Sequence, residues 1–207
     1  RLIDELEKEF KIPFLIIGNG DEYKALSELN NMKAKLVVPI KFPSKPNIND
    51  SYSSLAFDLA TLKHWEDAPF NLKKLQDEEI PYAISSIGNK KDNDFWNNLI
   101  LTHQCGLSEE NILAALTTVP ASFIDSEKKL GQLKPGFIAN FIVFDGPLLA
   151  KSSRLEENWV QGKKYLVNRL QKNISGIYDL RFNDEEYILN IKDSIGKAKG
   201  HITNLEK

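Results

Sequence analysis

The sequence predicts an α/β fold that leads into a β-rich C-terminal part. Three short apolar runs, at 12–18, 35–39 and 81–86, alternate with segments in which apolar residues recur every three or four positions. Strands separated by helices of this length indicate right-handed βαβ crossovers and a parallel sheet. After residue 136 the chain carries a further apolar run and then paired short segments, which are typical of hairpins.

The three apolar runs are each expected to be buried strands, because they lack the polar alternation of a half-exposed strand. The first run ends at Gly18. A long polar loop follows the second run and contains Pro43, Pro46, Asn47 and Asn49. Such loops often carry functional residues. Helices are expected at 1–10, 21–29, 55–65, 71–79 and 94–105.

The segment 106–146 combines a helical half with a strand half. Ser108, followed by two glutamates, predicts a helix N-cap with acids near the positive helix end. Pro120 fits the first turn of a second short helix. Lys134-Pro135-Gly136 predicts a type II turn, because glycine supplies a positive φ. The run 137–144 is almost wholly apolar, which predicts a strand covered on both faces.

The last third of the chain predicts hairpins. Segments 158–160 and 164–167 flank Gln161-Gly162-Lys163, which suits a hairpin turn. Further on, apolar residues alternate on both sides of a turn at 183–185, so a second hairpin with one apolar face is expected. A third strand is expected at 201–205. We interpret this tail as the start of an all-β module.

The composition is that of an ordinary globular protein, with 42% hydrophobic and 27% charged residues. A formal net charge of −2 gives no electrostatic reason to expect nucleic acid or a membrane surface as a partner. No apolar run reaches the length of a transmembrane helix. The single cysteine, Cys105, is expected to be buried and structural. Because Arg1 falls inside a helical pattern, we expect the chain to be a piece of a longer protein.

In chain order the segment 106–146 reads GLS-x-E-x-x-LxALTxxPA and then LGxLxPGxxANxxVFDG. This order resembles the C-terminal hinge of the amidohydrolase superfamily, especially its imidazolonepropionase-like and dihydroorotase-like members. Family members usually have aspartate where Asn140 stands. The residues that carry the match are Gly131, Leu133, Pro135, Gly136, Ala139, Val143 and Asp145.

The resemblance implies a partial TIM-like (β/α) barrel, then part of a small composite β-sandwich and a β-hairpin tail. It predicts the last βα units of the barrel at 1–130, part of the sandwich at 131–173 and a truncated β module at 174–207. A complete barrel has eight strands, so the missing N-terminal part of the same protein or a partner chain is expected to complete the fold. We also expect a homo-oligomer.

Amidohydrolases hydrolyse carbon–nitrogen bonds with bound metal, so the resemblance implies zinc or another divalent metal in full-length family members. Their ligands include a histidine after the sixth barrel strand and an aspartate after the eighth. Those positions fall at 16–19 and 83–88, where neither residue type occurs. Ile87 cannot coordinate a metal. The sequence therefore predicts no metal ligand and no catalytic residue in this segment.

Three other side chains have a functional and a structural interpretation. Asp92 and Asp94 could be displaced catalytic aspartates, but capping of the next helix is favoured. His64 could face a barrel mouth, with Glu66 or Asp67 orienting it. The favoured interpretation of His64 is a helix-end histidine that suits the dipole.

The remaining histidines and the first glycine-rich loop also favour structural roles. His103 is expected on a helix face near Cys105, and His201 lies in the tail, so the histidines predict no common site. The loop Gly18–Glu22 could bind a phosphate at the following helix N-terminus. Its two acids place negative charge there, which favours a turn and cap.

Two functions remain open at this point. The first is the C-terminal portion of an amidohydrolase-like enzyme, whose family activity is metal-dependent hydrolysis of carbon–nitrogen bonds in non-peptide amides. The second is a degenerate, non-catalytic amidohydrolase domain that serves as a scaffold or a subunit-contact module. The resemblance favours the enzyme, whereas the missing histidine and aspartate favour the scaffold.

Overall fold

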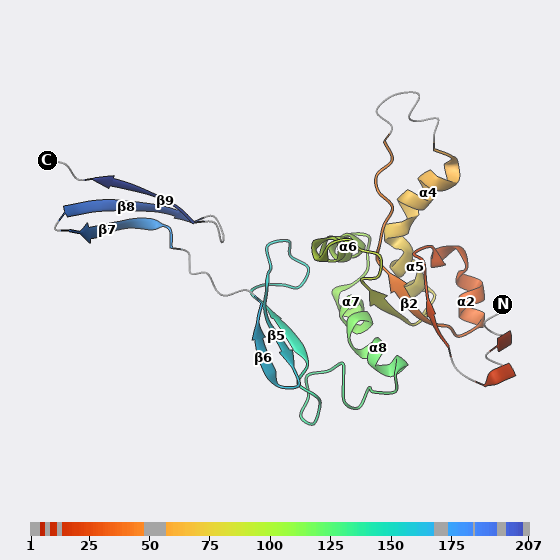
Figure 1. The fold of residues 1–207 in the computed structure, drawn as a ribbon. Coiled ribbons are helices and arrows are strands. Elements are labelled where there is room, and N and C mark those ends of the chain that lie inside the picture. Colours follow the sequence, from red (N-terminus) through yellow and green to blue (C-terminus); the bar gives the residue numbers. More distant parts are fainter. Residues whose placement is uncertain are drawn as a thin grey trace.

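The computed structural model describes residues 5–6, 9–11, 14–47, 57–167, 174–183, 185–193 and 198–204. Three three-stranded sheets and a set of short helices make up these parts (Figure 1). The predicted α/β class is confirmed. The helical pattern at 1–10 and the start of the first apolar run lie largely outside the described residues.

The first sheet is parallel, as predicted. Its strands β1 (Leu15–Ile17), β2 (Lys35–Pro39) and β3 (Tyr82–Ser85) lie in the order β1-β2-β3. The bounds of β2 are those predicted, because a proline and a change to polar residues end its apolar run. Helices connect the strands, so all three carboxyl ends meet at one edge of the sheet.

The predicted helix at 21–29 is interrupted. A short 3-10 helix η1 (Glu22–Lys24) precedes α2 (Leu26–Asn31), and Ala25 between them has a φ of −134°. The other helices match their predicted positions to within a few residues, although residues 55–56 lie outside the described parts. They are α4 (Leu59–Asp67), η2 (Ala68–Phe70), α5 (Asn71–Asp77), α6 (Asp92–Gln104), α7 (Glu109–Leu116) and α8 (Thr118–Phe123).

The hydrophobic core lies around β2, whose Leu36 and Val38 are each 1% exposed. Leucines and isoleucines from α5, α6 and α7 complete it, including Leu75, Leu99 and Ile112. In contrast, Leu15 and Ile17 of β1 are 45% and 63% exposed, so the prediction of a fully buried first strand was wrong for these two positions. No further strand pairs with β1 among the described residues.

Tyr82 carries a buried hydroxyl that has no hydrogen-bond partner within the described parts of the chain. Its side chain is 5% exposed, and burial raises its pKa above the ordinary 10.0. We expect Tyr82→Phe to leave stability unchanged or to raise it by up to about 1 kcal/mol, since it removes an unpaired polar group. Denaturant titration of the full-length protein, with the exposed Tyr165→Phe as control, measures this.

The same variant has a pH signature. The raised pKa of Tyr82 means that its contribution to stability is present below the unfolded pKa near 10.0 and is lost at higher pH. The wild type should therefore lose stability at alkaline pH faster than Tyr82→Phe. A clear loss of stability in the variant at pH 7 would show that the hydroxyl has a partner.

The second sheet is antiparallel and consists of β4 (Phe141–Phe144), β5 (Leu155–Val160) and β6 (Lys163–Leu166). The predicted hairpin is confirmed, and its loop is Gln161-Gly162, with φ values of 51° and 77°. The strand predicted at 137–144 starts only at Phe141. Coverage on both faces was also wrong, because Ile142 is 45% exposed.

The turn before β4 has the predicted geometry at its third position. The Phe137 amide donates to the Lys134 carbonyl at 3.1 Å, and Gly136 has a φ of 89°. Ser108 caps α7 as predicted, because its hydroxyl accepts from the Asn111 amide. The cap of α7 and the turn before β4, both within the segment 106–146, therefore form as the local sequence predicts.

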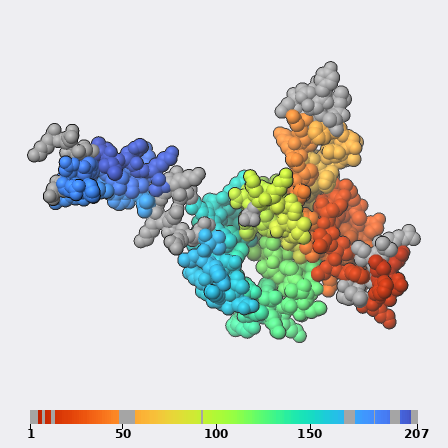
Figure 2. Space-filling model, in the orientation of Figure 1, coloured from red at the N-terminus to blue at the C-terminus, as the bar shows by residue number. Residues whose placement is uncertain are grey.

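The third sheet is also antiparallel and contains the predicted tail hairpin. It consists of β7 (Gly176–Phe182), β8 (Glu185–Asp193) and β9 (Ala198–Asn204), so the third strand starts three residues before the predicted position. Asp184 and Leu205 lie outside the described residues. Figures 1 and 2 show this sheet apart from the other two. The part boundaries at 130 and 173 stay predictions. No helix in the described residues is long and apolar enough to cross a membrane.

Candidate functional site

The carboxyl edge of the parallel sheet is the candidate functional site. In open sheets of parallel strands, ligands bind where the loops leave the carboxyl ends of the strands. Three loops leave this edge, starting at Gly18 after β1, at Ile40 after β2 and at Ser86 after β3. The polar side chains of these three loops determine which ligands the site could bind.

A buried carboxylate organises the first loop. Glu22 is 7% exposed, and its Oε1 accepts from the backbone amides of Asn19 at 2.7 Å and Gly20 at 3.0 Å. Its Oε2 accepts from the Nδ2 of Asn71, on α5. The loop amides that could bind a phosphate are therefore occupied by a carboxylate of the same chain. This agrees with the turn-and-cap interpretation.

Asn71 connects this carboxylate to the following residue. It is 2% exposed, and its Oδ1 accepts from the Tyr23 amide at 2.8 Å. Because Oδ1 is held by that amide, Nδ2 must point at Glu22. We call the group formed by Asn19, Gly20, Glu22 and Asn71 the Glu22 clamp. Sequence reasoning missed it, although an acid two residues after Gly-Asn-Gly is a signal for a carboxylate that folds back on loop amides.

The second and third loops are joined by amide side chains. The Nδ2 of Asn98, on α6, donates to the Ile40 carbonyl at 2.8 Å and lies 3.2 Å from the Oδ1 of Asn89. The side chain of Lys41 passes beside Gly88. A cavity of about 370 Å³ lies at this end of β3. It is lined by Ile84, Ser86, Asn89, Lys90, Lys91, Phe95 and Trp96.

Among the described residues, the donors at this edge do not fit a metal centre. β1 is followed by Gly18 and Asn19, and β3 is followed by Ser86 and Ile87. The described residues contain no group of three His, Cys, Asp or Glu side chains that could hold a metal ion. Glu22, which is buried, has both carboxylate oxygens committed to the clamp. We therefore derive no metal-dependent step from these residues.

His64 lies in the last turn of α4, which confirms the prediction of a histidine at the end of a helix. Its partner is the side chain of Tyr23. Its Nδ1 lies 3.0 Å from the Tyr23 hydroxyl, and the two rings stack with centroids 6.2 Å apart. Burial raises the pKa of Tyr23. Asp67 does not orient His64, because it pairs with Lys74 at 2.7 Å.

Neither Asp92 nor Asp94 is the N-cap of α6. The N-cap is Lys91, whose side chain makes no capping bond, and Asp92 is the first helical residue. The prediction of an aspartate cap was therefore wrong. Asp94 also lies in the first turn, where a negative charge suits the helix dipole. Neither observation places a catalytic aspartate at the sheet edge.

The remaining candidates lie on separate elements. His103 lies in the last turn of α6, and its Nδ1 is 2.7 Å from the carbonyl oxygen of Leu107. Its side chain is exposed, so it is not packed into the core. His201 is exposed on β9 opposite Asn190. Cys105 is half-buried, and burial raises the pKa of its thiol, which opposes reactivity. These positions form no common site.

No protein-family model and no curated protein sequence matches the chain. Solved structures do match it. An amidohydrolase from Thermotoga maritima is 21% identical with a TM-score of 0.60, over 80% of this chain and 39% of that one. The chain therefore shares part of its fold with this structure.

Two further solved structures also match the fold of the chain. A Xaa-Pro dipeptidase with methionine bound in its active site is 14% identical, with a TM-score of 0.53, over 78% of this chain and 47% of its own. A prolidase complexed with N-methylphosphonate-L-proline is also 14% identical, with a TM-score of 0.53. This match covers 73% of the present chain and 40% of the prolidase chain. The chain thus spans less than half the length of these structures.

Proposed function

We propose that this chain is part of an amidohydrolase-like hydrolase. In this proposal β1, β2 and β3 are late strands of a TIM-like barrel, and β4–β6 is part of a composite sandwich. The parallel order β1-β2-β3 with helical connections supports it. So do the exposed Leu15 and Ile17 on the open edge of β1, which a neighbouring barrel strand would cover. The fold similarity is the single observation that carries the assignment to hydrolases.

The activity we propose is hydrolysis of a carbon–nitrogen bond, with the metal-binding residues supplied by the rest of the protein. The described residues provide the wall and the polar loops of the site. The Glu22 clamp holds the first loop against α5, and Asn98 holds the second and third loops together. Exposed Ser86 lies at the end of β3, where a substrate would enter a barrel.

A non-catalytic scaffold is the second candidate, and one observation favours it. Where the family resemblance places a histidine and an aspartate, the loops carry Asn19 and Ile87. A barrel that has lost its ligands can keep its packing and present its surface to another subunit. The core around β2 needs none of the missing ligands.

Metal analysis of the full-length protein separates the two candidates. The hydrolase proposal expects about one or two divalent ions per chain, activity on a panel of amide substrates, loss of that activity on chelation and recovery on adding zinc. Ser86→Ala should then lower kcat/KM about tenfold, while Ser27→Ala, an exposed serine on α2, should leave it unchanged. A protein that binds no stoichiometric metal and has no activity supports the scaffold instead.

A further inference from the structure

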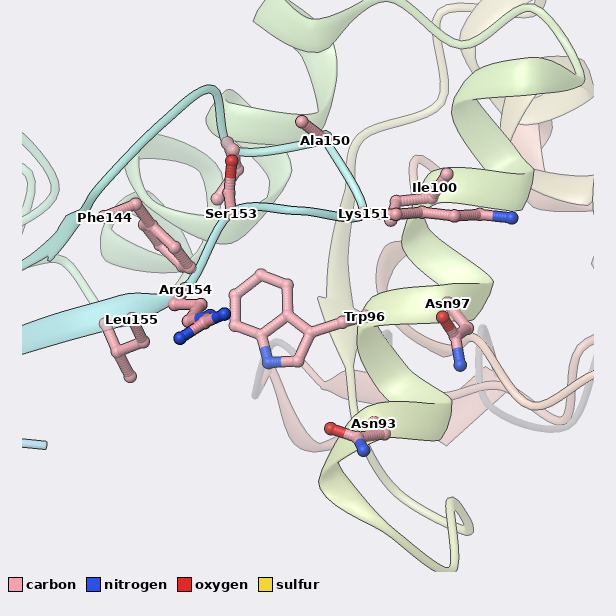
Figure 3. Close-up of a pocket in the computed structure, with 11 residues that line it drawn as sticks. Asn93, Trp96, Asn97, Ile100, Phe144, Ala150, Lys151, Ser153, Arg154 and Leu155 are labelled. Atoms are coloured by element: carbon pink, nitrogen blue, oxygen red, sulfur yellow. The ribbon is translucent and has the colours of Figure 1, made fainter. Parts of the chain in front are cut away.

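A second cavity lies between α6 and the loop that joins β4 to β5, and it shares Trp96 with the cavity at the end of β3. Its volume is about 400 Å³, within the range of small-molecule sites. One wall is α6, which contributes Asn93, Trp96 and Asn97. The other wall is Phe144 and the loop 148–155 (Figure 3). The Trp96 and Phe144 rings meet edge to face, with centroids 5.4 Å apart, so the two walls are packed together.

The residues of α6 present one face to this cavity. Positions 93, 96, 97 and 100 follow the spacing that places side chains on the same side of a helix. In Figure 3 Trp96 projects from α6 toward Phe144 and Arg154, and Asn93 and Asn97 lie along the helix. Trp96 offers a flat ring for stacking. The two amides offer donors and acceptors that can pair with the edge of a heterocycle.

The loop wall is basic. Lys151 and Arg154 line the cavity, and the described residues of its lining include no acidic side chain. Among the described residues, neither cation has an ion-pair partner. The hydroxyl of Ser153 is buried here without a hydrogen-bond partner in the described parts of the chain. Two uncompensated cations and an unpaired hydroxyl favour an anionic group with several acceptor oxygens, such as a phosphate.

The loop that carries these groups is held in place before any ligand binds. The carboxylate of Asp145 accepts from the Arg154 amide at 2.7 Å, and the Asp145 amide donates to the Arg154 carbonyl at 3.1 Å. Gly146 lies so close to Ser153 that a Cβ would approach its Oγ at 2.7 Å. The hydrogen bonds between Asp145 and Arg154 thus hold the two ends of the loop together. This reduces the conformational entropy that the loop would lose when a ligand binds.

We propose that this cavity is a binding site for a nucleotide of nucleoside-monophosphate size. The heterocycle stacks on Trp96 and pairs with the Asn93 and Asn97 amides. The phosphate forms an ion pair with the Arg154 guanidinium, and the Lys151 ammonium is the second cation that binds it. Of the residues named for the two cavities, only Trp96 is common to both, so occupancy of this site does not depend on whether the protein is a hydrolase or a scaffold.

Titration of the full-length protein with AMP, adenosine and inorganic phosphate tests the proposal by calorimetry and tryptophan fluorescence. We expect AMP to bind with a Kd between about 10 µM and 1 mM, and adenosine and phosphate to bind at least about tenfold more weakly. AMP should quench the fluorescence of the wild type, and Trp96→Phe should remove that quenching while keeping an aromatic ring in the core.

Arg154→Gln should weaken AMP binding about tenfold and leave adenosine binding unchanged. The matched control is Arg181→Gln, because Arg181 is an exposed arginine on β7, away from the cavity. Circular dichroism checks that each variant is folded. Three outcomes overturn the proposal: no AMP binding at millimolar concentration, equal affinity for AMP and adenosine, or equal losses in the two arginine variants.

Discussion

Asn71→Asp is expected to destabilise the protein by about 3–5 kcal/mol at pH 7, the range for a buried charge that lacks its partner. The substituted side chain has nearly the same shape, but it places a carboxylate oxygen where Nδ2 now donates to Glu22. Two buried carboxylates cannot both ionise at that distance, so the pKa of one of them rises in the folded state. Thermal and denaturant unfolding of the full-length protein measure the loss.

The sign of the pH dependence follows from that raised pKa. The variant should approach wild-type stability at low pH, where the pair shares a proton, and should lose stability as the pH rises through the folded-state pKa. A loss of stability that does not change with pH would mean that Asn71 acts through packing alone.

A compensating change tests the geometry of the Glu22 clamp. Glu22→Gln added to Asn71→Asp reverses the pair, because the new amide can donate to the new carboxylate. Its carbonyl can still accept from the amides of Asn19 and Gly20. The double variant should recover to within about 1–1.5 kcal/mol of the wild type. Glu28→Gln, an exposed glutamate on α2, is the control and should change little.

Gly18→Ala is expected to cost about 2–4 kcal/mol, through overpacking and the loss of loop hydrogen bonds. A Cβ at this position would overlap the Glu22 carboxylate and lie 2.7 Å from its Cδ. The side chain of Glu22 would have to move, and it cannot move without releasing the amides of Asn19 and Gly20. Equilibrium denaturation measures the difference from the wild type.

Two comparisons separate this overlap from other effects of alanine. In a Glu22→Ala background, Gly18→Ala should cost less than about 1 kcal/mol, since the carboxylate is absent. Gly136→Ala meets nothing within 4 Å but has a φ of 89°, so it should cost only about 1 kcal/mol of backbone strain. If Gly18→Ala costs the same in both backgrounds, the overlap does not explain its effect.

Local signals in the sequence determined much of the secondary structure. β2 has the predicted bounds because its apolar run ends at a proline and a polar loop. Ser108 starts α7, and Gln161-Gly162 joins β5 to β6. In each case the deciding contacts are made within a few residues along the chain, where cap and turn chemistry is sufficient. The resemblance at 106–146 also named the amidohydrolases, and a solved amidohydrolase structure matches the fold of the chain.

The tertiary structure determined which residues far apart in the sequence are in contact. Glu22 and Asn71 are 49 residues apart, so their hydrogen bond leaves no periodic signal in the sequence. The exposure of β1 depends on whether a neighbouring strand is present, which no pattern within the strand records. The cavity lined by Trp96 and Arg154 lies between α6 and the loop after β4. Long-range packing set these three features, whereas the sequence alone determined the strands, caps and turns from which they are built.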